Sequence, residues 1–259
     1  MNQAQRRLFL IQSLLKEKTE YRDIDIPAEP ESQRQLLRGL MNIRAPQRIE
    51  ADFLKMQDAY LQDETAAKGI TDAADLTPIQ PGRYLWQGDI TTLKCDAIVN
   101  AANSGMTGCY IPNHRCIDNA IHTYAGVELR LACAELMEQQ GYPEPTGRAK
   151  ITPAFNLPCR YVLHTVGPII SGRVTKADKE LLASCYRSCL ELAAENGLES
   201  VAFCCISTGE FHFPNEQAAE IAVRTVKEFY KKQTSVKKVI FNVFKDLDKE
   251  IYARLLGAD

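Results

Sequence analysis

Long apolar runs are missing from this sequence, and so is an excess of charge of either sign. No stretch approaches the roughly 20 apolar residues of a membrane-spanning helix, so no membrane span is predicted. The 31 basic and 33 acidic residues leave a net charge of −2, which excludes a general basic field for nucleic acid or anionic lipid. We therefore expect neither a nucleic-acid nor a membrane partner. A phosphate ligand stays possible, because backbone amides and helix N-termini bind phosphate without net positive charge.

Glycine is scarce in the first third of the chain, where only two occur before position 82. Apolar residues recur there at helical spacing in three segments, around residues 8–15, 36–41 and 49–61. A proline-containing break, IPAEPESQ, separates the first two segments. This pattern predicts a helical N-terminal extension over residues 1–80 and a main domain over residues 81–259.

A secretory leader is not indicated either. The N-terminal MNQAQRRLFLIQSLLKEK has a basic pair and a short apolar patch, but it lacks a small-residue cleavage site. The nine cysteines are odd in number and lie largely in apolar segments such as FCCIS (203–207), which is typical of reduced thiols rather than of a disulfide framework. We therefore expect a cytoplasmic protein.

From about Tyr84 onward, short strand patterns alternate with helix patterns, which predicts an α/β fold with a largely parallel sheet covered on both faces. YLWQGDIT and DAIVNAAN are expected to form a strand pair, and a single helix is expected over residues 118–140. Further strands are expected near residues 149–153, 161–166, 200–206 and 238–243, and further helices over 178–196, 215–232 and 246–256. In such sheets ligands bind outside the carboxyl ends of the strands, so residues directly after strands are the candidates for a site.

Three segments follow predicted strands and have suitable chemistry. The acidic side chain of Asp89, beside Gly88 and Ile90, can accept from an exocyclic amine, and Asn103 can donate to and accept from sugar hydroxyls. Each could instead be an ordinary turn residue. The third segment precedes a predicted helix, where successive amides can bind a diphosphate; it consists of Ser207, Thr208, Gly209, Glu210 and Phe211.

The run GCYIPNHRCIDN (108–119) places Cys109, His114 and Cys116 within eight residues. Thiolate and imidazole ligands suit zinc, and three protein ligands leave a fourth position open, which is typical of catalytic sites. The alternative is a structural site with a fourth ligand from Asp118 or His122. The remaining cysteines and His164 are interpreted as buried core residues; these cysteines are Cys95, Cys133, Cys159, Cys185, Cys189, Cys204 and Cys205.

Taken together, five ordered motifs resemble those of macrodomains: GDIT, VNAAN, IDNAIHTYAG, ITPAFNLPCRYVLHTVGP (151–168) and STGEFHFP. The resemblance implies a three-layer α/β/α fold that binds ADP-ribose, and many members of that family remove ADP-ribose from proteins. Two departures stand out: CYIPNHRC replaces a glycine-rich run, and His212 replaces a usual glycine. The whole pattern, helical N-terminal region included, is similar to a zinc-containing microbial branch in which the inserted Cys, His and Cys bind the metal.

This resemblance also implies roles for the residues. Asp89 would contact the adenine amine with the Ile90 backbone nearby, the loop from Ser207 to Phe211 would wrap the diphosphate, and Asn103 would contact the distal ribose. Asp118 would orient or activate water there, beside one Zn²⁺, and Asn103 and Asp118 would form the catalytic pair.

The predicted function is therefore a hydrolase that removes ADP-ribose from protein side chains, acidic ones in the leading hypothesis. The zinc branch is associated with a sirtuin-type transferase and a lipoyl-carrying, glycine-cleavage-H-like protein, so the resemblance implies such a modified carrier as substrate. Three alternatives remain: a reader that binds ADP-ribose without cleavage, an enzyme that deacetylates O-acetyl-ADP-ribose, and a zinc ion that only folds the 108–119 loop.

Overall fold

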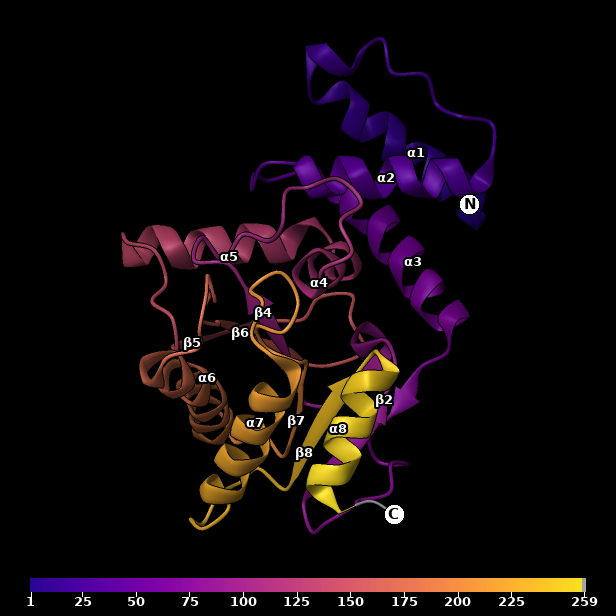
Figure 1. The fold of residues 1–259 in the computed structure, drawn as a ribbon. Helices are drawn as coiled ribbons and strands as arrows, with labels where there is room; N and C mark the ends of the chain where they lie inside the picture. The colour runs from indigo at the N-terminus through magenta and orange to yellow at the C-terminus, as the bar shows by residue number, and fades with distance from the viewer. Residues whose placement is uncertain (258–259) are drawn as a thin grey trace.

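The computed structural model describes residues 1–257, and its centre is a six-stranded sheet with the order β2-β8-β7-β4-β6-β5 (Figure 1). All neighbouring strands are parallel except β5 and β6, which are antiparallel. The strands are β2 (Arg83–Gln87), β4 (Ala97–Ala102), β5 (Ala149–Pro153), β6 (Tyr161–Val166), β7 (Ser200–Phe203) and β8 (Lys238–Val243). The mixed, largely parallel sheet predicted from the sequence is confirmed.

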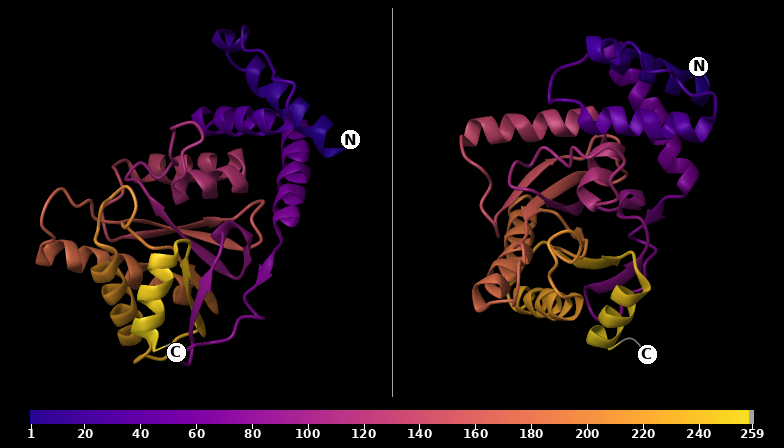
Figure 2. Two further views of the ribbon diagram at one scale, coloured as in Figure 1. Left: turned by 45° about the vertical axis from the view of Figure 1, so that its right-hand side comes forward. Right: turned by 45° about the horizontal axis from the view of Figure 1, so that its top comes forward.

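Helices cover both faces of this sheet (Figures 1 and 2). One layer contains α4 (Ile117–Ala125) and α5 (Val127–Gln140), and the other contains α6 (Lys176–Glu195), α7 (Asn215–Phe229) and α8 (Asp246–Leu256). Because both faces are covered, the central strands are almost continuously apolar, as in β4, where five of the six residues of AIVNAA are buried. The three-layer α/β/α architecture is confirmed.

The N-terminal extension forms three helices, as predicted: α1 (Gln3–Lys16), α2 (Pro30–Ile43) and α3 (Ala51–Lys68), with a 3₁₀ turn at Thr19–Tyr21. They enclose a small apolar core of their own, which also takes in Val127 from α5. After α3, the two-residue strand β1 (Thr71–Asp72) pairs with β3 (Leu93–Lys94), which follows the 3₁₀ turn Ile90–Thr92. Ala73 already belongs to the main core. Each core therefore takes in a residue from the other part of the chain, Val127 in the small core and Ala73 in the main core.

The single helix expected over residues 118–140 is wrong, because the chain breaks at Gly126, which has a φ of 97°. A Cβ at this position would lie 2.6 Å from the side-chain amide of Gln57 in α3. The Gln57 Oε1 atom accepts a hydrogen bond of 2.9 Å from the Val127 amide, the first amide of α5. The break between α4 and α5 thus makes room for the Gln57 side chain, through which α3 contacts the main domain.

The expected pairing of YLWQGDIT with DAIVNAAN is also wrong, since β8 and β7 lie between β2 and β4. Parallel strands need long crossover connections, so consecutive strands in an α/β chain are free to lie apart in the sheet. Five of the seven remaining cysteines are buried as expected, while Cys95 and Cys205 are only half-buried.

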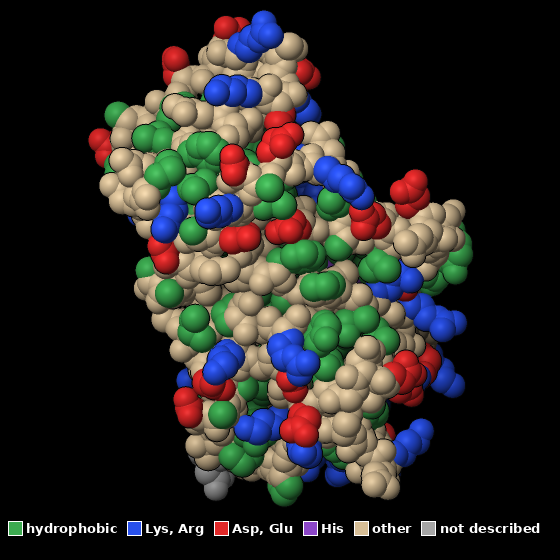
Figure 3. Space-filling view, turned by 180° about the vertical axis from the view of Figure 1, so that it is seen from behind, with side chains coloured by type: hydrophobic (Ala, Val, Ile, Leu, Met, Phe, Trp, Pro, Cys, Tyr) green, Lys and Arg blue, Asp and Glu red, His purple; other side chains and the backbone are tan. Residues whose placement is uncertain are grey.

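Among residues 1–257, no helix combines the length and the apolar character that crossing a bilayer requires. On the face seen in Figure 3, basic and acidic side chains are interspersed rather than separated into regions of one sign.

Candidate functional site

The three predicted ligand segments meet at one edge of the sheet. Strands β2, β8, β7 and β4 run parallel in that order, so their carboxyl ends share an edge. Three strand spacings separate β2 from β4, which places the residues after them about 14 Å apart. The loop after β7 lies between. The edge therefore presents an elongated row of strand ends, with Asp89 toward one end and Asn103 toward the other.

Asp89 caps the 3₁₀ turn that follows β2. Its Oδ1 atom accepts from the Thr91 amide (3.0 Å) and the Thr91 hydroxyl (2.6 Å), and its Oδ2 atom accepts from the Lys68 ammonium at the end of α3 (3.0 Å). Burial raises the pKa of the Asp89 carboxyl, but these hydrogen bonds and the Lys68 charge outweigh it and the net pKa is lowered. The carboxylate is thus ionised, and its oxygens can accept a further donor.

The loop from Ser207 to Pro214 is shaped by two residues with positive φ, Ser207 (66°) and His212 (57°). It is closed by bonds from the Phe213 amide to the Ser207 carbonyl (2.9 Å) and from the His212 amide to the Gly209 carbonyl (3.0 Å). These bonds leave the amides of residues 209–211 without a protein acceptor in the described chain. Helix α7 begins directly after this loop with no side-chain cap. Free amides beside a helix N-terminus provide the chemistry for binding a diphosphate.

At the opposite end of this row of strand ends, the side-chain amides of Asn100 and Asn103 contact the carboxylate of Asp118. The Nδ2 atom of Asn100, in β4, donates to Asp118 Oδ1 (2.8 Å), and Asn103 Nδ2 lies 3.4 Å from Asp118 Oδ2 and donates to the Gly108 carbonyl (3.1 Å). Asp118 is buried in the first turn of α4, and this burial raises its pKa to about 6, against the Asn100 hydrogen bond and the Arg130 charge. A carboxyl with a pKa near neutrality is suited to proton transfer.

Two buried histidines belong to the surroundings of Asp118, one in contact with Asn100 and one in contact with the carboxylate itself. His164 is buried in β6 with its Nδ1 atom 3.2 Å from the Asn100 amide and its Nε2 atom 2.9 Å from the Thr152 hydroxyl, so its predicted role as a satisfied core residue is confirmed. His122 is buried with its Nε2 atom 3.6 Å from Asp118 Oδ1, and within the described chain neither ring nitrogen has a hydrogen-bond partner. Burial lowers the pKa of His122 well below its usual value, so this ring is neutral.

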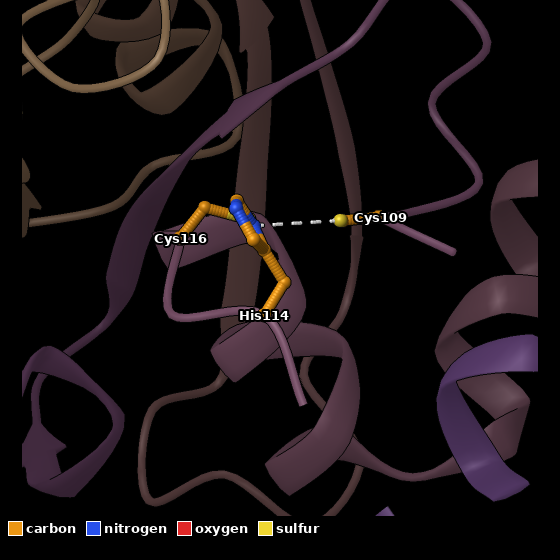
Figure 4. Close-up of side chains that lie close together, drawn as sticks. All are labelled: Cys109, His114 and Cys116. Carbon is orange, nitrogen blue, oxygen red and sulfur yellow. Dashed lines mark hydrogen bonds between the residues drawn. The ribbon is translucent and has the colours of Figure 1, made fainter. Parts of the chain in front are cut away.

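Cys109, His114 and Cys116 converge above the N-terminus of α4, and their candidate ligand atoms all lie within 4.8 Å of one another (Figure 4). Cys109 Sγ is 3.7 Å from His114 Nδ1. Cys116 is the N-cap residue of α4, and its sulfur accepts from the Asn119 amide at 3.4 Å. In residues 1–257 neither Asp118 nor His122 joins this group.

These three side chains fit a zinc ion. Tetrahedral Zn²⁺ with these ligands needs donor atoms roughly 3.3–3.8 Å apart, which small side-chain rotations would reach from the observed positions. Burial raises the pKa of the Cys116 thiol to about 12, and the neighbouring Cys109 sulfur adds to this rise, against the Asn119 amide. A bound divalent cation would offset both the burial and the repulsion between two thiolates.

Glu210 belongs to the predicted diphosphate loop, and its side chain is 68% exposed. Its carboxylate nevertheless lies 3.7 Å from His114 Nε2, whereas the other ring nitrogen of His114, Nδ1, faces Cys109. A carboxylate on the second nitrogen of a ligating histidine commonly fixes the ring orientation and tautomer. This contact joins the diphosphate loop to the Cys/His loop, and sequence spacing could not have indicated it.

Phe244 is a further residue that the sequence reasoning missed. It directly follows β8, the strand between β2 and β7, and it is 77% exposed. An aromatic side chain exposed at a strand end beside Asp89 is suited to stacking against a base. The signal in the sequence was an aromatic residue immediately after the buried strand KVIFNV.

Comparisons with known proteins agree with this geometry. Residues 99–222 match the family model described as Macro domain. A protein from Treponema medium named protein-ADP-ribose hydrolase is 59% identical, over 99% of this chain and 100% of its own length.

Two solved structures are also similar: a mutant Oceanobacillus iheyensis macrodomain with ADPR and a Trypanosoma brucei macrodomain in complex with ADP-ribose. The first is 38% identical with a TM-score of 0.64, covering 70% of this chain and 96% of that one. The second is 30% identical with a TM-score of 0.65, covering 85% and 95%. With the sheet order, the strand-end loops and these matches in agreement, the chain belongs to the macrodomain family.

Proposed function

We propose that this protein is a hydrolase that removes ADP-ribose from modified protein side chains, acidic ones in the first instance, with zinc at the reacting end. The observation that carries the proposal is the convergence of a buried carboxylate, Asp118, with the Cys109, His114 and Cys116 group at the end of β4. A reader domain needs only a binding surface, whereas this end of the row has the groups for proton transfer. The relative named protein-ADP-ribose hydrolase supports the same activity.

ADP-ribose would lie along the strand ends. Its adenine would sit by Gly88, Asp89 and Ile90, with the Asp89 carboxylate accepting from the exocyclic amine and Phe244 stacking on the ring. Its diphosphate would bind the 207–211 loop through the free amides of residues 209–211, beside the N-terminus of α7. This orientation brings the distal ribose to Asn103, which is half-buried and accessible.

At the distal ribose, Asp118 would hold a water molecule against the anomeric carbon and accept its proton as the carbon–oxygen bond to the modified side chain breaks. The products are free ADP-ribose and the restored carboxylate. Asn100 and Asn103 fix the orientation of Asp118, and Asn103 is placed to bind a ribose hydroxyl. A zinc ion on Cys109, His114 and Cys116 would supply Lewis acidity and a binding position for ribose hydroxyls. Two thiolate ligands make that acidity modest.

Turnover of an ADP-ribosylated protein tests the proposal. Purified protein is incubated with a carrier modified on acidic side chains, and the released ADP-ribose is quantified. The rate is compared with that on O-acetyl-ADP-ribose as a competing substrate. Release from the protein at the higher kcat/KM supports the hydrolase. Binding of ADP-ribose without release would identify a reader, and a large preference for O-acetyl-ADP-ribose would identify a deacetylase.

Replacing Asp89 by alanine is predicted to weaken ADP-ribose binding by about 10- to 100-fold, as expected for loss of a hydrogen bond to a charged group worth about 1.5–3 kcal/mol. The turnover number at saturating substrate should change little, because Asp89 lies about three strand spacings from β4. Calorimetric titration with ADP-ribose measures the first effect. Unchanged affinity would place adenine elsewhere along the edge.

We also propose the wider context that the family resemblance implied. The substrate would be a lipoyl-carrying, glycine-cleavage-H-like protein modified by a sirtuin-type transferase. Nine cysteines without a disulfide in the described chain are typical of a reducing compartment, and we place the protein in the cytoplasm. Residues 1–80 would act as an extension of a macrodomain that covers residues 81–259.

A further inference from the structure

We infer that helix α2 of the N-terminal extension is a positioning element for the proposed zinc loop, with Arg38 and Asn42 holding residues 109–116 in the conformation that brings their ligand atoms together. The inference rests on the proposed function only in taking Cys109, His114 and Cys116 as metal ligands. It assigns the extension a role in the site in addition to its own packing.

Arg38 joins the C-terminal part of this loop to the first turn of α4. Its Nη2 atom donates to the His114 carbonyl (2.9 Å) and to Asn119 Oδ1 (2.8 Å), and its Nε atom also donates to Asn119 Oδ1 (3.2 Å). The backbone of a ligand residue and the first turn of α4 are thereby tied to one guanidinium. Asn119 extends the contact inward, because its Nδ2 atom donates to the Ile111 carbonyl (3.1 Å) and its amide donates to the Cys116 sulfur.

Asn42 lies one turn further along α2 and is buried. Its Oδ1 atom accepts from the Asn113 amide (3.0 Å), and its Nδ2 atom donates to the Thr123 hydroxyl of α4 (3.0 Å). The carbonyls of Asn42 and Arg44 accept from the guanidinium of Arg130. That guanidinium also stacks on the Tyr110 ring, with 4.2 Å from Cζ to the ring centroid. The end of α2 therefore contacts the loop at two places, directly at Asn113 and through Arg130 at Tyr110.

The loop approaches α2 at Gly39, between these two side chains. A Cβ at this position would lie 3.4 Å from Asn113 Nδ2 and 3.7 Å from Pro112 Cβ. These are ordinary contact distances, so a methyl group would fit at this position in contact with the loop. A longer side chain at this position would push the loop away.

The loop needs such support because it has little of its own. Residues 110–113 are exposed, Asn113 has a positive φ of 57°, and one internal backbone bond, from the His114 amide to the Ile111 carbonyl, spans it. A flexible loop loses conformational entropy when its ligands converge on an ion, and prior ordering removes that cost from binding. With three protein ligands in the described group, metal affinity depends strongly on this ordering.

The test compares zinc affinity in Arg38→Ala, Asn42→Ala and the matched control Arg34→Ala, all in the full chain. Arg34 lies one helical turn before Arg38 on α2 but pairs with Glu31 and Glu64 instead of the loop. Affinity is measured by competition with a chromophoric chelator, together with ADP-ribose affinity and thermal unfolding. Arg38→Ala and Asn42→Ala are expected to bind zinc about 10- to 100-fold more weakly, with unchanged ADP-ribose affinity at saturating zinc, and Arg34→Ala should match the unmutated protein.

Equal zinc affinity in the unmutated protein and both loop variants would overturn the inference while leaving the proposed function intact. Loss of ADP-ribose binding at saturating zinc, together with a lower unfolding temperature, would also overturn it, because general unfolding would then be the cause. Arg38→Lys, which keeps the charge without the two-way fork, serves as the milder variant and should show an intermediate loss. An unmutated protein that binds no zinc would overturn the inference and the metal role together.

Discussion

Replacing Cys109 or Cys116 by alanine is expected to remove the metal and to lower ADP-ribose release by about 100-fold or more, since a catalytic metal contributes several kcal/mol of transition-state stabilisation. Each change deletes one of three converging ligand atoms. The sheet should remain folded, because both side chains are half-buried in the strand-end loop rather than in the main core. Metal content, turnover and circular dichroism are measured together.

Cys95→Ala is the matched control for these variants. Cys95 is also half-buried, but it precedes β4 and so lies at the opposite edge of the sheet from the site. It should keep its full metal content and activity. If the Cys109 and Cys116 variants lose thermal stability but retain full turnover, zinc serves only to order the 108–119 loop, and the catalytic role is contradicted.

Asp118→Asn is expected to lower turnover by about 10²- to 10⁴-fold, which is the usual contribution of a positioned proton-transfer group. Asparagine has nearly the same shape, so the contact with Asn100 and the packing of α4 should largely survive. The amide cannot accept the proton from water. ADP-ribose affinity and zinc content should stay close to those of the unmutated protein, which separates this variant from the cysteine variants.

The decisive measurement for Asp118→Asn is single-turnover release from a modified carrier, with ADP-ribose affinity measured by calorimetry on the same sample. Asp96→Asn provides a carboxylate control at the opposite edge of the sheet, where Asp96 accepts from the Ser200 and Glu199 amides. Release at the unmutated rate by Asp118→Asn would remove this carboxylate from the mechanism. Another group would then have to accept the proton from the attacking water.

The largest elements were predictable because the hydrophobic periodicity is strong. Helix α7 begins at Asn215, directly after Pro214 as expected, and β8 covers Lys238–Val243 as expected. The helix over 118–140 failed because a single Gly126 has a positive φ that periodicity does not reveal. The strand pair failed because crossover connections, rather than order in the chain, decide which parallel strands become neighbours.

The sequence by itself determined the fold class and the identity of the candidate ligands, because alternating strand and helix patterns and a dense Cys/His run are local features. It also named Asp118, Asn103 and the 207–211 loop through their motifs. Only the tertiary structure decided what surrounds them. Asp118 has its raised pKa because packing buries it, against the opposing hydrogen bond from Asn100. Glu210 reaches His114 across two loops, and Arg38 contacts the ligand loop from 76 residues away. These contacts join segments distant in the chain, so they depend on packing that no local pattern encodes.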